Sequence, residues 1–386
     1  MNQSISKSNY FASGILGIIL IMNFVVGFIN EYIEIQNLFP ILIAFLGALL
    51  VAYNLIKKKL KAQINIGIFG VVCMFAVQLI FSALLINRPI TIYYIQCFGC
   101  VAIPCMYIGS ADIDLRIVRH TSLIAALMCC TYYCTLLTKE YTVYNSAEQM
   151  GTAYSLVPII CISCWTIMHT RDRWGWKLIA IVHVCACIML FVRFMTRGAW
   201  ACIFVFFVIC VLTWKKKRSV KIVAIAAGPI IAVMVYYLLI SCFVNTDLYQ
   251  LLFVAKSDDF FNGRTDLYLK AFSYRGVIPS LLGSGIGAFY TENRQTYPHN
   301  LFGQLYYDQG LVVMLYIIVI IACAMILFWK YNKENKQDAY LLLLLLCASI
   351  LRLMVSYYFW IDQLFWVFLS YVTKEYYIKR KVSVKK

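Results

Sequence analysis

The chain consists of long apolar runs separated by short polar stretches. Runs of about 17 to 25 residues have the length that a helix needs to cross a lipid bilayer. Most of these runs are apolar on every side, which suits helices and not the alternating pattern of a membrane barrel. The pattern predicts about twelve transmembrane helices, at residues 11–29, 38–56, 64–86, 91–109, 120–137, 151–168, 178–195, 198–214, 222–244, 309–329, 339–355 and 358–373.

One connection is much longer than the others. Segment 245–308 lies between the ninth and tenth predicted helices and is the only connection with room for a small structure outside the membrane. We therefore predict an all-α, polytopic membrane protein in three parts. These are helices one to nine in 1–244, an extracytoplasmic loop with short helices in 245–308, and the last three helices with a basic cytoplasmic tail in 309–386.

The composition supports this class. Of 386 residues, 63% are hydrophobic and 13% are charged, and the mean hydropathy is +0.79. A soluble domain is about half apolar and about one quarter charged, and its interior is too small to hide so much apolar surface. The same apolar content excludes a disordered chain, because it is more than enough to offset the entropy of folding.

The formal net charge of +17 is explained by the positions of the basic residues. With a cytoplasmic N-terminus, the inner segments hold 24 basic and six acidic residues, and the outer ones hold ten basic and eleven acidic residues. The inner side therefore carries +18 and the outer side −1, as the positive-inside rule requires. This predicts a multi-pass protein of the cytoplasmic membrane with both termini in the cytoplasm. No basic run is interleaved with a soluble module, so nucleic acid is not an expected partner.

Two further features limit the protein class. The first apolar run has only Lys7 ahead of it and no small-residue cleavage site, so we expect it to be retained. The 16 cysteines lie in or beside apolar runs, and none lies in the long loop, which argues against a secreted disulfide scaffold. The CxxC pairs at 97–100 and 161–164 lack histidine partners, so we interpret them as helix-packing residues and expect no metal.

The long loop contains candidate ligands for phosphate. A helix is predicted from Gly263 to Tyr274, with Asn262 as its N-cap. Arg264, Tyr268 and Arg275 would then lie close to one face, because eleven residues make nearly three turns. Two guanidinium groups beside a membrane suit a phosphate or diphosphate ligand. The alternative is a solvated helix whose arginines touch lipid headgroups.

The same loop ends in a candidate base. Residues 283–287, Gly-Ser-Gly-Ile-Gly, predict a tight turn where the backbone passes close to another segment; no strand–helix unit follows, so this is not a nucleotide loop. Pro298 favours an extended residue before it, which places His299 and Asn300 at or near a helix start. A neutral imidazole there can accept a proton from a sugar hydroxyl. The alternative is an ordinary surface histidine.

Three more arginines interrupt apolar sequence. Arg193 and Arg197 are four residues apart where the seventh predicted span ends and the eighth begins, so a continuous helix would put both on one face. Arg352 lies near the outer end of the eleventh span. Arginine in hydrocarbon costs several kcal/mol unless it pairs or reaches the interface. Each can simply reach the interface, but their convergence on the outer leaflet favours an anionic lipid-phosphate pocket.

Taken together, these motifs resemble the O-antigen ligase/polymerase family of bacterial surface polysaccharide synthesis. The resemblance covers nearly the whole chain, with ten to twelve spans and one large external loop before the last few. Each motif is short, and the specificity lies in their order, spacing and sidedness. The motifs are Thr196-Arg197-Gly198-Ala199-Trp200, Gly263-Arg264-x-x-x-Tyr268, Leu282-Gly283-Ser284-Gly285-x-Gly287, His299-Asn300-x-x-x-Gln304 and Gly310-Leu311.

The resemblance implies glycan transfer from undecaprenyl diphosphate on the outer face of the bacterial cytoplasmic membrane, without nucleotide, metal or other cofactor. The family's functional positions correspond here to Arg197, Arg264 and His299, which are the expected catalytic residues. Tyr268 stands where the family often has Trp, so an aromatic contact is expected to be kept. The substrate-binding residues that we add from charge, depth and position are Arg193, Arg275, Arg352, Asn300 and Asp308.

The chemistry of these residues fits such a transfer. No ATP is available outside the cell, so the donor must already be activated by its diphosphate. Breaking the anomeric bond builds negative charge on this leaving group, and fixed arginines stabilise it there. His299 is the first choice to deprotonate the acceptor hydroxyl, with Asp308 or Glu292 in reserve, and Asn300 would orient the base or the sugar.

The expected partners are a polyprenyl-diphosphate-linked oligosaccharide, a glycan acceptor, membrane lipids and other polysaccharide assembly proteins. A polymerase of lipid-linked repeat units is the leading interpretation. A ligase that moves the finished glycan to a different acceptor, such as a lipid A core, uses the same donor. A twelve-span transporter or glycolipid flippase matches the span count, but it would commonly show two similar halves and a longer central cytoplasmic loop than residues 169–177 provide.

Overall fold

The structure is a computed structural model that describes residues 9–57, 66–84, 92–139, 146–169, 173–194, 196–213, 264–293, 297–334 and 336–384. Every regular element in these ranges is helical, and none is a strand, which confirms the predicted all-α class. The predicted ninth span at 222–244 lies outside the described residues.

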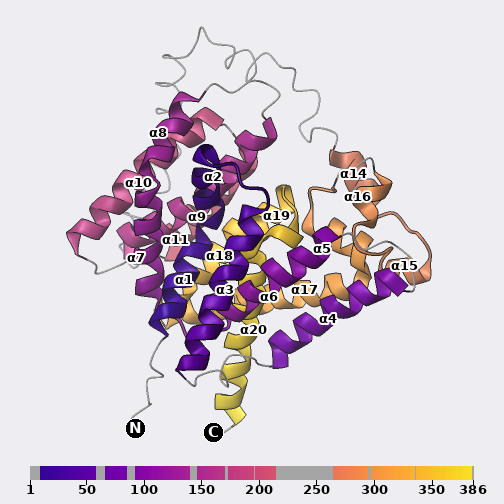
Figure 1. The fold of residues 1–386 in the computed structure, drawn as a ribbon. Helices are drawn as coiled ribbons and strands as arrows, with labels where there is room; N and C mark the ends of the chain where they lie inside the picture. The colour runs from indigo at the N-terminus through magenta and orange to yellow at the C-terminus, as the bar shows by residue number, and fades with distance from the viewer. Residues whose placement is uncertain are drawn as a thin grey trace.

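The described helices follow one another in the order shown in Figure 1. The first group is α1 (Tyr10–Leu20), α2 (Met22–Tyr32), α3 (Leu38–Ile56), α4 (Ile66–Leu84), α5 (Ile92–Gln96), the π-helix η2 (Cys97–Ala102), α6 (Ile103–Gly109), α7 (Leu115–Met128), α8 (Cys130–Thr138), α9 (Ser146–His169), α10 (Trp174–Phe194) and α11 (Arg197–Thr213). The second group is α14 (Arg264–Ala271), α15 (Val277–Leu282), α16 (Ala288–Glu292), α17 (Leu301–Lys333), α18 (Asp338–Leu345), the π-helix η5 (Leu346–Leu351), α19 (Arg352–Val355), the 3₁₀ turn η6 (Phe359–Ile361) and α20 (Gln363–Val384).

Several of these helices have the length and composition of membrane spans. Five continuous helices qualify, and two bent pairs, α1 with α2 and α7 with α8, raise the number to seven if each pair is one span. The pairs bend by 65° and 51°, at Ile21 and Cys129. The helices α4, α5–α6 and α11 are apolar but shorter. The described part of the chain thus supports five to seven spans, and the total of twelve stays a prediction.

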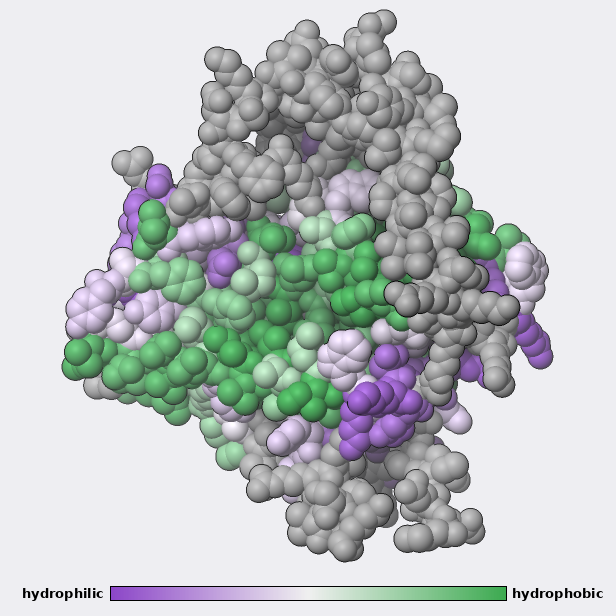
Figure 2. Space-filling model, turned by 180° about the vertical axis from the view of Figure 1, so that it is seen from behind, coloured by the Kyte–Doolittle hydropathy of each residue, from purple (hydrophilic) through white to green (hydrophobic). Residues whose placement is uncertain are grey.

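A broad apolar surface surrounds these helices. Large hydrophobic side chains are exposed along α3, α4, α10 and α17, for example at Phe45, Ile80, Val182 and Ile326. On the rear face of the molecule, Figure 2 shows hydrophobic residues as a green band, with more polar residues toward its edges. Soluble monomers rarely expose a continuous apolar patch of this kind. The band therefore indicates a membrane protein whose outer surface meets lipid.

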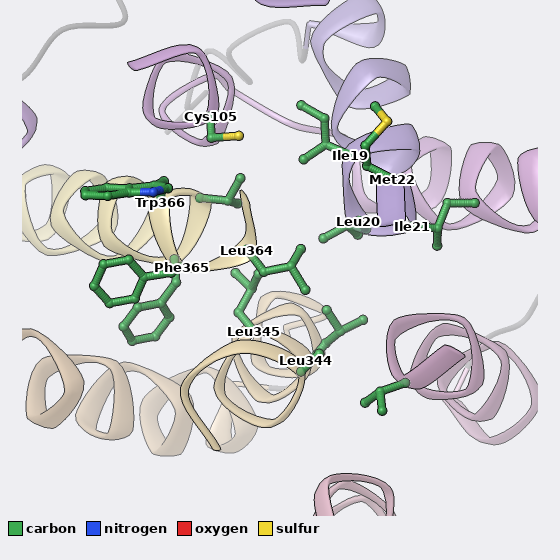
Figure 3. Close-up of a cluster of buried hydrophobic side chains, with 14 of the residues drawn as sticks. Ile19, Leu20, Ile21, Met22, Cys105, Leu344, Leu345, Leu364, Phe365 and Trp366 are labelled. Carbon is green, nitrogen blue, oxygen red and sulfur yellow. The ribbon is translucent and has the colours of Figure 1, made fainter. Parts of the chain in front are cut away.

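The interior is built around α20. Residues 364–372 are all buried, so the first half of this helix is enclosed on every side. It packs against α1, α4, α6, α17 and α18. In Figure 3, Leu364, Phe365 and Trp366 of α20 lie among side chains of three other segments: Cys105 of α6, Ile19 to Met22 at the α1–α2 bend, and Leu344 and Leu345 of α18. α20 is therefore the central helix of the described bundle.

One end of the bundle is held by polar contacts between helix ends. The backbone N–H of Asn9 donates to the carbonyl of Asp112 at 2.8 Å, and its side chain donates to Asn54 at 3.1 Å. The ammonium of Lys374 donates to the carbonyl of Ala111 at 2.7 Å and pairs with Asp112 at 3.0 Å. Figure 1 shows α1 beginning and α20 ending at this same lower end of the molecule.

A second polar cluster joins other helix ends. Lys139, which follows α8, pairs with Glu31 near the end of α2 at 3.1 Å and with Glu148 near the start of α9 at 2.9 Å. The hydrogen bonds to Glu148 and Glu31 raise the pKa of Lys139, so its ammonium stays charged at neutral pH. The guanidinium of Arg193, in the last turn of α10, donates to the Lys139 carbonyl.

The close approach of α6 to α20 gives a test of this packing. A Cβ at Gly109 would overlap the Ser370 hydroxyl and lie 2.9 Å from the Val367 carbonyl. We expect Gly109→Ala to destabilise the protein by about 1–3 kcal/mol, because the two backbones must separate. Gly151→Ala is the matched control, since a Cβ at that position on α9 would meet nothing within 4 Å apart from the adjoining backbone of its own helix; it should be neutral or stabilising by up to about 1 kcal/mol. Thermal unfolding in detergent compares the two, and equal midpoints would refute this close packing.

Candidate functional site

The loop after α15 is fixed against α17 by two glycines. Gly283 has φ 90° and Gly310 has φ 84°. A Cβ at Gly283 would overlap the backbone of Asp308. A Cβ at Gly310 would overlap the carbonyl group of Leu281 and the backbone nitrogen of Gly283. Two main-chain hydrogen bonds of 2.9 and 3.0 Å join the same segments. The predicted tight turn with a close backbone approach is confirmed, and it breaks α17 at Gly310.

Asp308 forms hydrogen bonds with the start of the short helix α16, which precedes it in the chain. Its side chain is 1% exposed, and its two oxygens accept the backbone N–H groups of Phe289 at 2.9 Å and Gly287 at 3.3 Å. These groups begin α16, where a carboxylate is favoured by the helix dipole. Glu292, the other reserve base, accepts a hydrogen bond from the Tyr307 hydroxyl at 2.5 Å. Both carboxylates therefore have structural partners within the chain.

His299 lies at the start of α17, as predicted. Asn300 is the N-cap of this helix, and its side-chain oxygen accepts the N–H of Gly303 at 3.0 Å. His299 itself has φ 50°, in the left-handed region that non-glycine residues rarely adopt. Its half-buried ring packs on that of Tyr297, with a centroid distance of 4.2 Å. The cap and the aromatic contact thus fix the backbone on both sides of the imidazole.

A tyrosine cluster connects the histidine segment to helices far away in the chain. The ring of Tyr297 lies 6.2 Å from that of Tyr358, whose hydroxyl donates to the hydroxyl of Tyr94 on α5 at 2.8 Å. Sequence reasoning missed Tyr94 and Tyr358. The available signal was the pair of Tyr-Tyr dipeptides, at 93–94 and 357–358, each at the outer edge of a predicted span where aromatic residues gather.

Arg275 has a different position from the one predicted. The helix α14 ends at Ala271, so Arg275 does not continue its face, and that prediction is wrong. The guanidinium instead lies 3.7 Å from the centre of the Tyr307 ring and donates to the Tyr307 carbonyl at 2.9 Å and to the Ser284 hydroxyl. Burial lowers the pKa of Arg275. These contacts pull the chain away from a helical path and tie it to α17.

Arg352 forms an ion pair inside the protein. It is 1% exposed, and its guanidinium pairs with the carboxylate of Asp362, which is fully buried. The guanidinium also lies 4.3 Å from the centre of the Tyr357 ring. Asp362 in addition accepts the N–H groups of Leu364 at 2.9 Å and Phe365 at 3.0 Å, at the start of α20. Sequence reasoning missed Asp362, although a lone carboxylate at the edge of an apolar run is a signal of function or pairing.

The two arginines that the family resemblance singles out begin helices. Arg197 is the first residue of α11 and Arg264 the first of α14. Their side chains lie outside what the structure describes, as do Asn262 and Gly263. The helix α14, which carries the half-buried Tyr268, packs on α17, and α11 packs on α19. Arg193, Arg275 and Arg352 each contact different residues of the chain. These contacts do not bring the three arginines together in one site.

The described residues contain no group of three His, Cys, Asp or Glu side chains that could hold a metal ion. The cysteines in these ranges are free thiols. No protein-family model matches the chain, and no curated protein is significantly similar to it. The sequence motifs and the geometry around His299 are therefore the features of this chain that point to a function.

The buried ion pair provides a test of the site's framework. We expect Asp362→Ala to destabilise the protein by about 3–5 kcal/mol, because the Arg352 charge would be left buried without its partner. Glu334→Ala is the control, since its pair with Lys336 is exposed to solvent and should be worth at most about 1 kcal/mol. Chemical or thermal unfolding in detergent micelles measures both. A loss at Asp362 no larger than that at Glu334 would contradict this assignment.

Proposed function

We propose that the protein is a metal-independent glycosyltransferase acting at the outer face of a bacterial cytoplasmic membrane. It joins undecaprenyl-diphosphate-linked oligosaccharide repeat units into O-antigen or capsular polysaccharide. The ordered motifs that resemble the O-antigen ligase/polymerase family support this proposal, together with the apolar helices of a membrane protein. The single observation that carries it is the conformation of His299.

A left-handed backbone at a non-glycine residue costs about 1–3 kcal/mol and persists only where neighbouring contacts determine it. Such residues gather at active sites and ligand-binding segments. At His299 these contacts come from the Asn300 cap and the Tyr297 ring. Histidine is also the side chain that ordinarily exchanges a proton near neutral pH. A fixed imidazole at this point is therefore suited to accept the proton of the attacking sugar hydroxyl.

The diphosphate of the donor would bind Arg264 and Arg197, which begin α14 and α11. Packing of α14 on α17 supports Arg264 in particular, because the same helix α17 begins beside His299. Arg275 contributes by fixing the loop through Tyr307, and Arg352 by its pair with Asp362. The leaving diphosphate gains charge as the anomeric bond breaks, and a preset guanidinium stabilises this charge without reorganisation.

The two polar clusters support the proposed division of the connecting segments between two sides, with the termini in the cytoplasm. Asn9, Asp112 and Lys374 belong to segments that the charge distribution assigns to the cytoplasm. They join one another and Asn54, at the cytoplasmic end of the predicted span 38–56. The cluster around Lys139 joins segments assigned to the outer face. The long loop is then external, on the side where a lipid-linked glycan would be presented.

Reconstitution tests the proposal. The full-length protein in liposomes would be incubated with an undecaprenyl-diphosphate-linked oligosaccharide, and the products separated on a gel. A ladder of products identifies a polymerase. A single shifted band that appears only with a different acceptor identifies the ligase, which uses the same donor. Failure to form product with every acceptor tried would contradict both.

The proposed roles also predict the effect of substitutions. His299→Ala removes the base and should lower the transfer rate by about 10²–10⁴-fold; Arg264→Ala should lower it by about 10²–10³-fold. Membrane insertion and yield should be unchanged. Arg173→Ala, which alters an exposed arginine before α10 in a segment predicted to be cytoplasmic, should transfer at the normal rate. Normal products from both His299→Ala and Arg264→Ala would overturn the site.

A further inference from the structure

A cavity of about 340 Å³ lies between α2, the turn before α3, and the start of the π-helix η2. This volume falls within the usual range for small-molecule sites, roughly 300–1,000 Å³. Its apolar wall includes Val26, Leu38 and Val101, and no lining residue carries a charge. Apart from the Cys97 thiol, its polar lining consists of amides and phenols, from Asn23, Asn30, Asn37, Tyr93, Gln96 and Tyr357.

The amides in this cavity are available to a ligand. Asn37 precedes α3 without capping it, and Gln96 precedes η2 without capping it. Within the described part of the chain, the side chains of Asn30, Asn37 and Gln96 form no hydrogen bond. Each amide offers both donors and an acceptor. Three solvent-exposed amides around one cavity thus provide both halves of a hydrogen-bonding surface, on which a ligand can replace water.

The backbone around the cavity is unusual in two ways. Among the described residues, the non-glycine positions with positive φ are Asn37, Tyr357 and His299, and the first two line the cavity. For a bulky residue such as Tyr357, φ 84° is a costly conformation of the kind found at ligand sites. The opposite wall is formed by the beginning of a π-helix, a rare element that is frequent at functional sites.

We propose that this cavity binds an uncharged sugar residue. Sugar hydroxyls donate and accept hydrogen bonds, as the amides and phenols here do, and the apolar wall can contact the ring face. A phosphate would find no cation, and a lipid tail would leave the amides without partners. Resting on the proposed function, the inference assigns this cavity to the neutral part of the glycan, apart from the arginines that would bind the diphosphate.

The cavity is connected to the candidate base through neighbouring tyrosines. Tyr93 and Tyr357 line it, and the next residue in each segment belongs to the hydrogen-bonded pair Tyr94–Tyr358. Tyr358 in turn contacts Tyr297, which packs on His299. A sugar bound in the cavity would therefore lie beyond this tyrosine pair, as a neighbouring unit of the chain whose hydroxyl reacts.

Ligand-observed NMR tests the inference directly. Full-length protein in nanodiscs would be titrated with methyl glycosides of neutral hexoses and N-acetylhexosamines, followed by saturation transfer. We expect transfer to at least one glycoside, and about tenfold weaker binding in Gln96→Leu and in Asn30→Leu, as expected for a lost hydrogen bond in each. Gln36→Leu is the matched control, because Gln36 is exposed in the same turn but does not line the cavity; its affinity should be unchanged.

Absence of saturation transfer to every glycoside, or equal affinity in wild type and both cavity variants, would overturn the inference. The reconstituted transfer assay separates this result from failure of the proposed function. Sugar binding that is lost in Gln96→Leu, without any transfer by the wild type, would uphold the cavity and reject the glycosyltransferase. The opposite result is a wild type that transfers glycan and cavity variants that keep both its sugar affinity and its acceptor KM. It would uphold the glycosyltransferase and reject the cavity as a sugar site.

Discussion

The buried carboxylate of Asp362 determines how α20 meets the helices α18 and α19 that precede it. It pairs with Arg352 at the end of one π-helical stretch and accepts the first N–H groups of α20. A lone charge in such an apolar interior costs several kcal/mol, so neither partner is tolerated without the other. Because α20 is the central helix, this pair sets the register against which α1, α4, α6, α17 and α18 pack.

Asp308 repeats the same arrangement at the edge of the candidate site. Each carboxylate accepts two backbone N–H groups at the start of a helix. Asp308 lies two residues before the non-helical Gly310, and Asp362 follows the irregular stretch between α19 and η6. Buried backbone that leaves helical geometry is stable only when its polar groups find partners inside the protein. The two carboxylates thus allow the chain to leave helical geometry near Tyr357 and Gly287, where the cavity and the loop are built.

The sequence predicts most helices because an apolar run long enough to span a bilayer has one stable solution, a helix. Local signals also predicted the turn at 283–287 and the helix start at Asn300, since glycine and proline act on their immediate neighbours. The bends at Ile21 and Cys129 carry no such residue, so no local signal predicted them. Likewise, Arg275 and Arg352 took partners 32 and 10 residues away, which a charge count cannot supply.

The central position of α20 has a consequence for biosynthesis. It is the last of the described helices to be made, yet it fills the middle of the bundle. Until it arrives, α1, α6 and α18 have no permanent neighbour on their inward faces, and the Arg352 side chain has no carboxylate. We therefore expect the earlier helices to pack less tightly until α20 has been made. Ribosome-bound chains that stop before residue 363 should be the targets of membrane chaperones and quality-control proteases.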